Sequence, residues 1–205
     1  MSQFQHPEMC ETSFLLSENL CNFLYPELPT LVQGLSWVLL YSTRRHGFSL
    51  RTLYRRSTFC PGPCLLVARD AEGTILGGLL EAPLQPSTRK RYQGTNNTFV
   101  FTNVSGKPDI FRPTGANRYF ILCMNDSLAI GGGGHFALYL DEDLLNGSSA
   151  TSETFGNSCL AQTEDFVVTD VEFVLQLWGF AQTSRYSSHP YREPQEALGI
   201  SSVFA

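Results

Sequence analysis

Cysteine and histidine are the residue types in this chain with the widest range of chemistry. Cysteines stand at positions 10, 21, 60, 64, 123 and 159, and histidines at positions 6, 46, 135 and 189. Cys60 and Cys64 flank a Pro-Gly-Pro turn, and His46 lies upstream, which is part of a zinc-binding pattern. A structural zinc site usually needs two ligand pairs, and the sequence has no second pair. We therefore expect no metal and no other cofactor.

Reaction of a thiol with peroxide is a second kind of chemistry open to the cysteines. A thiol beside arginines can have a lowered pKa and become sensitive to oxidants. The redox candidates are Cys64, Cys123 and Cys159. Buried, unreactive cysteine is the commoner outcome for this residue type. The cysteines also lack the spacing of a secreted disulfide scaffold, so free thiols in a reducing compartment are expected.

The other patterns that could support catalysis are incomplete. The glycines at 131 to 134 suggest a phosphate-binding loop, but no Gly-Lys-Ser or Gly-Lys-Thr follows them. The sequence contains no Gly-x-Ser-x-Gly nucleophile elbow, although a triad built from distant residues stays open. The acidic residues at 141 to 143 lack the spacing of a calcium loop and are typical of turns. We therefore expect a protein that is not an enzyme.

Charge is unevenly distributed along the chain. The net charge is −5 and the pI is about 5.3, which argues against a general nucleic-acid binder. Most basic residues lie in two short segments, which contain Arg44, Arg45, Arg51, Arg55 and Arg56, and then Arg89, Lys90 and Arg91. These form either a local positive patch or a solvated helix face and a basic loop. Glu81 ends an apolar strand, where a carboxylate costs energy unless it is paired or faces solvent. It either pairs with a cation or caps backbone amides, or it has a role in partner contact or proton transfer. The candidate partner-binding residues are Glu81 and the five arginines of the first segment.

The apolar patterns predict a mostly β protein with flanking helices (α+β), folded as a two-sheet antiparallel β-sandwich. Strands are expected at 37–41, 65–69, 74–82, 98–102, 118–123 and 136–140, with one or two closing strands over 166–180. Helices are expected over 13–24 and after Ser49, whose hydroxyl can cap a helix that places Leu50 and Leu53 on one face. Residues 84–97 have the composition of a surface loop.

Composition divides the chain into three parts. Residues 1–30 form an N-terminal helical segment, residues 31–183 the main domain, and residues 184–205 a tail without apolar periodicity. Neither a signal peptide nor a run long enough to span a bilayer is apparent. We expect an intracellular, soluble monomer that does not insert into membranes and that is located in the cytosol or also in the nucleus.

One stretch carries a family resemblance. Residues 126–144 read DSLAIGGGGHFALYLDEDL, and ETFGN follows at 153–157. This pattern resembles the signature of the TLDc domain, and the likeness extends from about residue 31 to residue 180. The segments YQGTNNTFVFTN (92–103) and FRPTGANRYF (111–120) are most similar to the single-domain, plant-type members. The resemblance implies a central β-sandwich with flanking helices. The matched positions, which we interpret as structural, are Asp126, Gly131, Gly132, Gly133, Gly134, Asp141, Gly156 and Asn157.

The resemblance also implies a function. Members of the TLDc family are associated with resistance to oxidative stress and with binding of the vacuolar-type proton ATPase. The chain would then be a non-enzymatic interaction module whose protein partner is the cytosolic sector of that ATPase. The alternative is a thiol-based antioxidant or hydrolytic enzyme that acts directly, for which one residue such as Cys64, Cys123 or Cys159 would be indispensable. A weaker alternative, transcriptional function through nucleic acid, requires affinity that falls steeply with salt.

The last predicted strand departs from the family pattern. The chain reads VEFVLQLWGF at 171–180, whereas the pattern runs from Val-Glu directly to Leu-Trp-Gly-Phe. Residues Phe173 to Gln176 therefore look inserted, and we hypothesise that they are a splicing product or an error in defining the gene. An insertion of four residues preserves the alternation of side chains. An edge strand tolerates it, whereas a central strand shifts its ladder and moves Trp178 from its pocket.

Overall fold

The computed structural model describes residues 12–30, 33, 36–59 and 61–177. Its helices are α1 (Glu18–Leu24), α2 (Thr43–His46) and α3 (Leu50–Ser57), with a 3-10 turn η1 (Tyr25–Glu27). Its first six strands are β1 (Ser36–Ser42), β2 (Gly62–Asp70), β3 (Ile75–Ala82), β4 (Tyr92–Gln93), β5 (Phe99–Thr102) and β6 (Asp109–Phe111). The others are β7 (Ile121–Cys123), β8 (Ser127–Ile130), β9 (Leu138–Asp141), β10 (Asn146–Ser148) and β11 (Asp165–Leu177).

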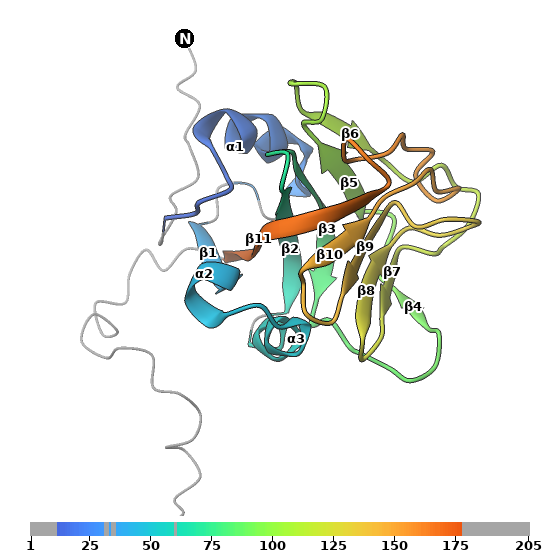
Figure 1. The fold of residues 1–205 in the computed structure, drawn as a ribbon, viewed down its shortest axis with the longest axis horizontal. Helices are drawn as coiled ribbons and strands as arrows, with labels where there is room; N and C mark the ends of the chain where they lie inside the picture. The colour runs from blue at the N-terminus through green and yellow to red at the C-terminus, as the bar shows by residue number, and fades with distance from the viewer. Residues whose placement is uncertain (1–11, 31–32, 34–35, 60, 178–205) are drawn as a thin grey trace, which may run out of the picture.

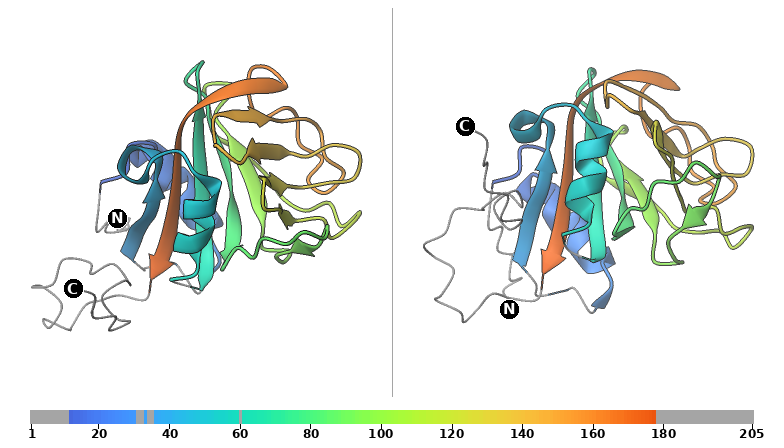
Figure 2. Two further views of the ribbon diagram at one scale, coloured as in Figure 1. Left: turned by 60° about the horizontal axis from the view of Figure 1, so that its bottom comes forward. Right: turned by 90° about the horizontal axis from the view of Figure 1, so that it is seen from below.

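These strands form two packed antiparallel sheets (Figures 1 and 2). Sheet A has the order β1-β11-β2-β3-β5-β6, and sheet B has the order β4-β7-β8-β9-β10-β11. Strand β11 belongs to both, because its first residues pair with β10 and its later residues pair with β1. The predicted fold class, a mostly β sandwich with flanking helices, is confirmed.

Several predicted strands are shorter than expected, and short ones were missed. The strand predicted over 118–123 contains only Ile121–Cys123, because the backbone of Tyr119 bonds to the Asn117 side chain (3.0 Å) instead of to a neighbouring strand. The strand predicted over 136–140 is Leu138–Asp141, and β8 precedes the glycine run where none was expected. The predicted loop 84–97 contains the two-residue strand β4.

The main core lies between the two sheets and beneath α3. On β2, Leu66 and Ala68 point into this core, while Leu65 and Val67 point to the opposite face of sheet A. Both faces of sheet A are therefore covered, which explains why β2 is a continuous apolar run and not an alternating one.

The N-terminal segment covers the outer face of sheet A. Helix α1 begins where the Ser17 hydroxyl accepts a hydrogen bond from the Leu20 backbone (3.3 Å). Five buried leucines of this segment form a second core with Trp37 and the outer face of the sheet; they are Leu15, Leu16, Leu20, Leu24 and Leu28. The buried carboxylate of Glu172 on β11 accepts hydrogen bonds from the Ser13 hydroxyl and the Phe14 backbone. The segment is thus part of the folded core.

The residues that look inserted lie in the middle of sheet A. Strand β11 runs between β1 and β2, and Phe173 pairs with Tyr41 on one side and Leu66 on the other. The ladder with β2 is regular over these residues, whereas the ladder with β1 shifts register between Leu39 and Tyr41, which pair with Val174 and Phe173. Phe173 and Val174 are fully buried in the two cores. Trp178, whose pocket was in question, lies outside the described residues.

We expect Gly77→Ala to destabilise the sandwich strongly. Gly77 on β3 lies between Val67 and Phe101 of the neighbouring strands. A Cβ atom there would lie 2.0 Å from the backbone oxygen of Leu66, so two strands would have to separate. The expected loss of unfolding free energy in urea is about 3 kcal/mol. The control is Gly106→Ala in the β5–β6 turn, where nothing lies within 4 Å and only the positive φ of 81° adds strain, about 1 kcal/mol. Equal losses for the two variants would contradict this packing.

Candidate partner-binding surface

Helices α2 and α3 carry the predicted arginine segment on one side of the sandwich. The Ser49 hydroxyl caps α3 by accepting from the Thr52 backbone (3.2 Å), as the sequence predicts. Leu50, Leu53 and Tyr54 of α3 are buried in the main core, and the Tyr54 hydroxyl donates to the Ser127 carbonyl of β8 (2.8 Å). The helix is therefore fixed to both sheets, which leaves its other side exposed.

Arg44 is held by the fold. Its Nε donates to Asp170 on β11 (2.6 Å), and its guanidinium lies 4.5 Å from the ring centre of Phe14. Arg69 of β2 donates to the second oxygen of the same carboxylate. Burial alone would raise the pKa of Asp170, but the two arginines outweigh it, so the pKa is lowered. Arg44 thus contacts the N-terminal segment through Phe14 and β11 through Asp170, which lies 126 positions away from it.

The remaining arginines of the segment differ in exposure. Arg56 is half-buried and donates to the Leu40 carbonyl of β1 (3.3 Å). Arg45, Arg51 and Arg55 are exposed. Neither Arg51 nor Arg55 forms an ion pair or a side-chain hydrogen bond with another described residue. These two cations are available to a partner.

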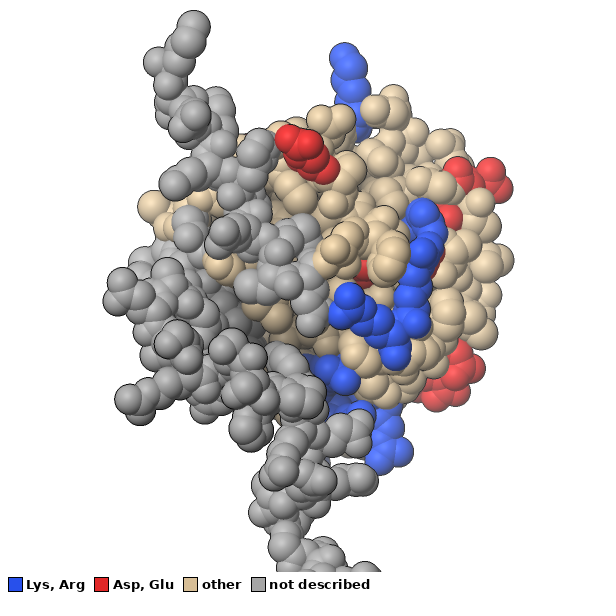
Figure 3. All heavy atoms as spheres, turned by 90° about the vertical axis from the view of Figure 1, so that its left-hand side faces the viewer, with Lys and Arg blue, Asp and Glu red and all other residues tan. Residues whose placement is uncertain are grey.

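Two exposed phenylalanines flank α3, and the sequence analysis missed them. Phe48 precedes the helix and is 41% exposed, and Phe59 follows it and is 48% exposed. Arginine and aromatic residues, including phenylalanine, are enriched at protein interfaces relative to the rest of the protein surface. We call Arg45, Phe48, Arg51, Arg55 and Phe59 the α2–α3 surface. Figure 3, which faces the side that carries α2, shows basic side chains gathered there. Bulky apolar residues next to helix ends were the available sequence signal.

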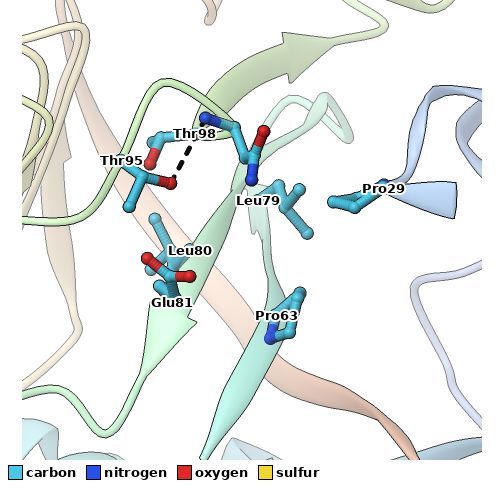
Figure 4. A pocket seen from close by; sticks show the side chains of 8 residues that line it. Pro29, Pro63, Leu79, Leu80, Glu81, Thr95 and Thr98 are labelled. Atoms are coloured by element: carbon cyan, nitrogen blue, oxygen red, sulfur yellow. Dashed lines mark hydrogen bonds between the residues drawn. The ribbon is translucent and has the colours of Figure 1, made fainter. Parts of the chain in front are cut away.

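Glu81 does not join this surface. It lies on β3 between Leu80 and Ala82, which point into the main core beneath α3, so its side chain is on the opposite face of sheet A. The carboxylate is exposed and borders a recess of about 10 Å³ that Pro29, Pro63 and Thr95 also line (Figure 4). Such a volume holds at most one water molecule. Glu81 therefore faces solvent, and its contact with a partner stays a prediction.

The basic loop is also separate from the α2–α3 surface. Arg89, Lys90 and Arg91 precede β4, at the edge of sheet B. Figures 1 and 2 place β4 and α2 on opposite sides of the molecule. The two basic segments therefore do not form one patch.

Comparison with known proteins identifies the family of this sandwich. The chain matches the TLDc domain over residues 9–180. It belongs to the TLDc family. This confirms the predicted family, and the matched range includes α1; the proposed boundaries at 31 and 184 and the likeness to plant-type members stay predictions.

Relatives of this TLDc chain include much longer proteins. It is 41% identical to oxidation resistance protein 1 of Homo sapiens over 180 residues, which is 87% of this chain and 20% of that protein. The protein of the same name from Xenopus tropicalis is 43% identical over 177 residues, 85% of this chain and 19% of the relative. Nuclear receptor coactivator 7 of Homo sapiens is 41% identical over 175 residues, 85% of this chain and 18% of the relative. The chain thus spans about a fifth of the length of these proteins.

The TLDc signature residues hold together two loops beside sheet B, the glycine run at 131–134 and the segment 152–157. The Gly132 backbone donates to the Thr154 hydroxyl (2.9 Å), and the Ser152 hydroxyl donates to the Asn157 amide oxygen (2.8 Å). A Cβ atom on Gly131 would lie 2.9 Å from that Ser152 hydroxyl oxygen. The glycine run and the segment 152–157 therefore pack backbone against side chain.

The other signature positions have turn geometry. Asp141 accepts from the Leu145 backbone (3.0 Å) and the Asn146 side chain (2.7 Å), and Asp126 accepts from the Ser127 hydroxyl (3.1 Å). Gly156 has a φ of 59°, which favours glycine.

The three redox candidates differ in their exposure to solvent. Cys64 and Cys123 are buried in the main core, and Cys159 is half-buried, with its thiol 3.2 Å from the Ser149 carbonyl. Within the described ranges, no three His, Cys, Asp or Glu side chains are grouped to hold a metal ion. Cys60 of the partial zinc pattern lies outside those ranges, and His46 Nδ1 accepts from the Ser42 backbone (3.1 Å). No helix in the described part of the chain is long and apolar enough to cross a membrane.

Proposed function

We propose that this TLDc domain is a monomeric, non-enzymatic interaction module of the cytosol. It contributes to oxidative-stress resistance by binding and regulating the cytosolic sector of the vacuolar-type proton ATPase. The observation that carries the proposal is the α2–α3 surface, where exposed arginines and phenylalanines lie on and beside a helix that is anchored to both sheets. Similarity to proteins named oxidation resistance protein 1 supports the link to oxidative stress.

The two surface hollows found among the described residues are small, which favours a macromolecular partner over a small substrate. The recess beside Glu81 has a volume of about 10 Å³. A second hollow, between η1 and Arg112, has a volume of about 260 Å³, and its lining includes the ion pair of Arg112 with Glu27 (2.5 Å). Small-molecule sites are mostly apolar clefts of roughly 300 to 1,000 Å³. Exposed arginine and aromatic side chains are instead typical of a protein interface.

The α2–α3 surface can attract a partner through long-range electrostatics and stabilise the complex through apolar contact. Arg51 and Arg55 attract an acidic surface over about a Debye length, roughly 8 Å at physiological salt. Phe48 and Phe59 each lose exposed apolar area when a partner covers them, which favours the complex. Because the helix is already ordered, little conformational entropy is lost on binding.

Charge reversal on α3 tests the proposal. The purified chain is expected to bind the isolated cytosolic sector saturably, with affinity that decreases as salt is added. Arg55→Glu should weaken binding about tenfold, because attraction becomes repulsion, and the double change with Arg51→Glu should weaken it further. The matched control is Lys107→Glu, an equal charge change at an exposed position in the β5–β6 turn, which should alter affinity less than twofold. Absence of binding by the folded chain would overturn the ATPase role. If the Arg55 and Lys107 changes weaken binding equally, the α2–α3 surface is not the binding site for the cytosolic sector.

A further inference from the structure

A stacked pair of tyrosines lies at the edge of sheet B, away from the α2–α3 surface. The ring centres of Tyr92 and Tyr119 are 4.6 Å apart, with 26° between the ring planes. Tyr92 is on β4 and pairs with Leu122, whose neighbours on β7 point into the main core, so Tyr92 faces outward. Tyr119 is 44% exposed. The outward face of β4 therefore presents aromatic surface to solvent.

The tyrosine pair is held in place by the glycine run. A Cβ atom on Gly132 would lie 2.9 Å from the Cβ of Tyr119 and 3.0 Å from the hydroxyl oxygen of Tyr92. The Asn117 amide oxygen accepts from the Tyr119 backbone (3.0 Å) and from the Thr154 hydroxyl (2.8 Å), and that hydroxyl accepts from the Gly132 backbone (2.9 Å). The pair is thus ordered before any partner arrives, which lowers the entropy lost on binding.

Four cations precede the two tyrosines in the sequence, on the same two segments of the chain. They are Arg89, Lys90, Arg91 and Arg118, all exposed, and none forms an ion pair with another described residue. Two exposed carboxylates lie on adjoining segments: Asp126 in the β7–β8 turn and Glu153 beside Gly133. Positive charge therefore exceeds negative charge on this part of an otherwise acidic protein.

We propose that this tyrosine surface, formed by Tyr92, Tyr119 and the four cations, binds an acidic segment of a protein partner. Carboxylates of the segment pair with the unpaired cations, and an aromatic or aliphatic side chain of the segment stacks on Tyr119. The overall charge of −5 opposes long polyanions such as nucleic acid or an anionic membrane, whereas a short segment meets only the local positive field. This site goes beyond the proposed function, because it needs neither the ATPase nor the α2–α3 surface.

The test measures fluorescence anisotropy of a labelled peptide of glutamates with two central phenylalanines. The wild-type chain should bind it with affinity that decreases with salt. The double change Arg91→Glu and Arg118→Glu should weaken binding at least tenfold, and Tyr119→Ala should weaken it severalfold, while Tyr119→Phe keeps the stacked ring and the affinity. Lys107→Glu, a charge reversal at an exposed position in the β5–β6 turn, should change it less than twofold. Unchanged melting temperatures confirm that each variant is folded.

Several results would overturn the tyrosine surface. The first is that the wild-type chain does not bind the peptide. The second is that the wild type and the Arg91/Arg118 variant bind the peptide with equal affinity. The third is that the chain binds oligothymidine or phosphatidylserine vesicles more tightly than it binds the peptide. Failure of the ATPase proposal is distinguishable, because it appears as loss of binding to the cytosolic sector while peptide binding persists.

Discussion

A chain that lacks residues 1–30 is expected not to fold. The five leucines from Leu15 to Leu28 are at most 6% exposed and cover the outer face of sheet A. Burial of each leucine side chain contributes about 2 kcal/mol, so the segment contributes on the order of 10 kcal/mol, which is comparable with the whole stability of a typical domain. Trp37, Phe99 and Phe101 would face water without it. Circular dichroism and size-exclusion chromatography should show an unfolded or aggregated chain.

A single substitution tests the same interface more gently. Leu24 is fully buried at the end of α1, and Leu24→Ala should lower the unfolding free energy by about 3 kcal/mol. Asn22→Ala on the exposed side of the same helix is the matched control and should change it by less than about 0.5 kcal/mol.

A chain that lacks residues 1–30 and has an unaltered melting curve would contradict the first prediction and show that residues 1–30 are dispensable.

Cys123 is expected to react with iodoacetamide or hydrogen peroxide about a thousandfold more slowly than an ordinary thiol at pH 7. Burial raises the pKa of its thiol from 9.0 to about 12, and hydrogen bonds lower it only in part. The thiolate is the reactive form, and its fraction at pH 7 decreases tenfold for each unit by which the pKa rises. Burial likewise raises the pKa of Cys21 to about 11.

Mass spectrometry of native and urea-unfolded chain after brief alkylation checks this expectation. Among the four described cysteines, Cys159 alone should be labelled in the native state, because Cys21, Cys64 and Cys123 are buried. The same pKa shifts predict that stability decreases above pH 9, where thiols of the unfolded chain ionise and those of the folded chain do not until about pH 11 to 12. Rapid labelling of native Cys123, or peroxide consumption that Cys123→Ser abolishes, would favour the direct antioxidant alternative instead.

Local patterns in the sequence predicted the parts of the fold that depend on local chemistry. The Ser49 cap, the apolar side of α3 and the β2–β3 hairpin follow from residues within a few positions of one another. The continuous apolar run of β2 gave no clue to what covers its second face, because that cover comes from α1, about fifty positions earlier. The union of the two sheets by β11 likewise depends on pairings with both β1 and β10.

The candidate site was predictable only in part. Local sequence placed Arg51, Arg55 and Arg56 toward solvent, because they fall opposite the apolar face of the helix. Arg51 and Arg55 are exposed, but Arg56 is half-buried, because it donates to the Leu40 carbonyl of β1. It could not show that Asp170 engages Arg44, because the two are far apart in the chain. The positions of Phe48 and Phe59 beside the helix ends were visible in the sequence, but their exposure was not, because it depends on which distant residues pack around them.

Hydrogen exchange of the chain, alone and bound to the cytosolic sector of the vacuolar-type ATPase, tests the central claim most directly. We expect slower exchange in the complex over residues 43–59, which contain α2, α3 and Phe59, because a partner on that surface excludes water and stabilises both helices. Residues of β5 and β6, which lie at the opposite edge of sheet A from β1, should exchange at unchanged rates. Protection confined to other segments, or no protection at saturating sector concentration, would contradict the account.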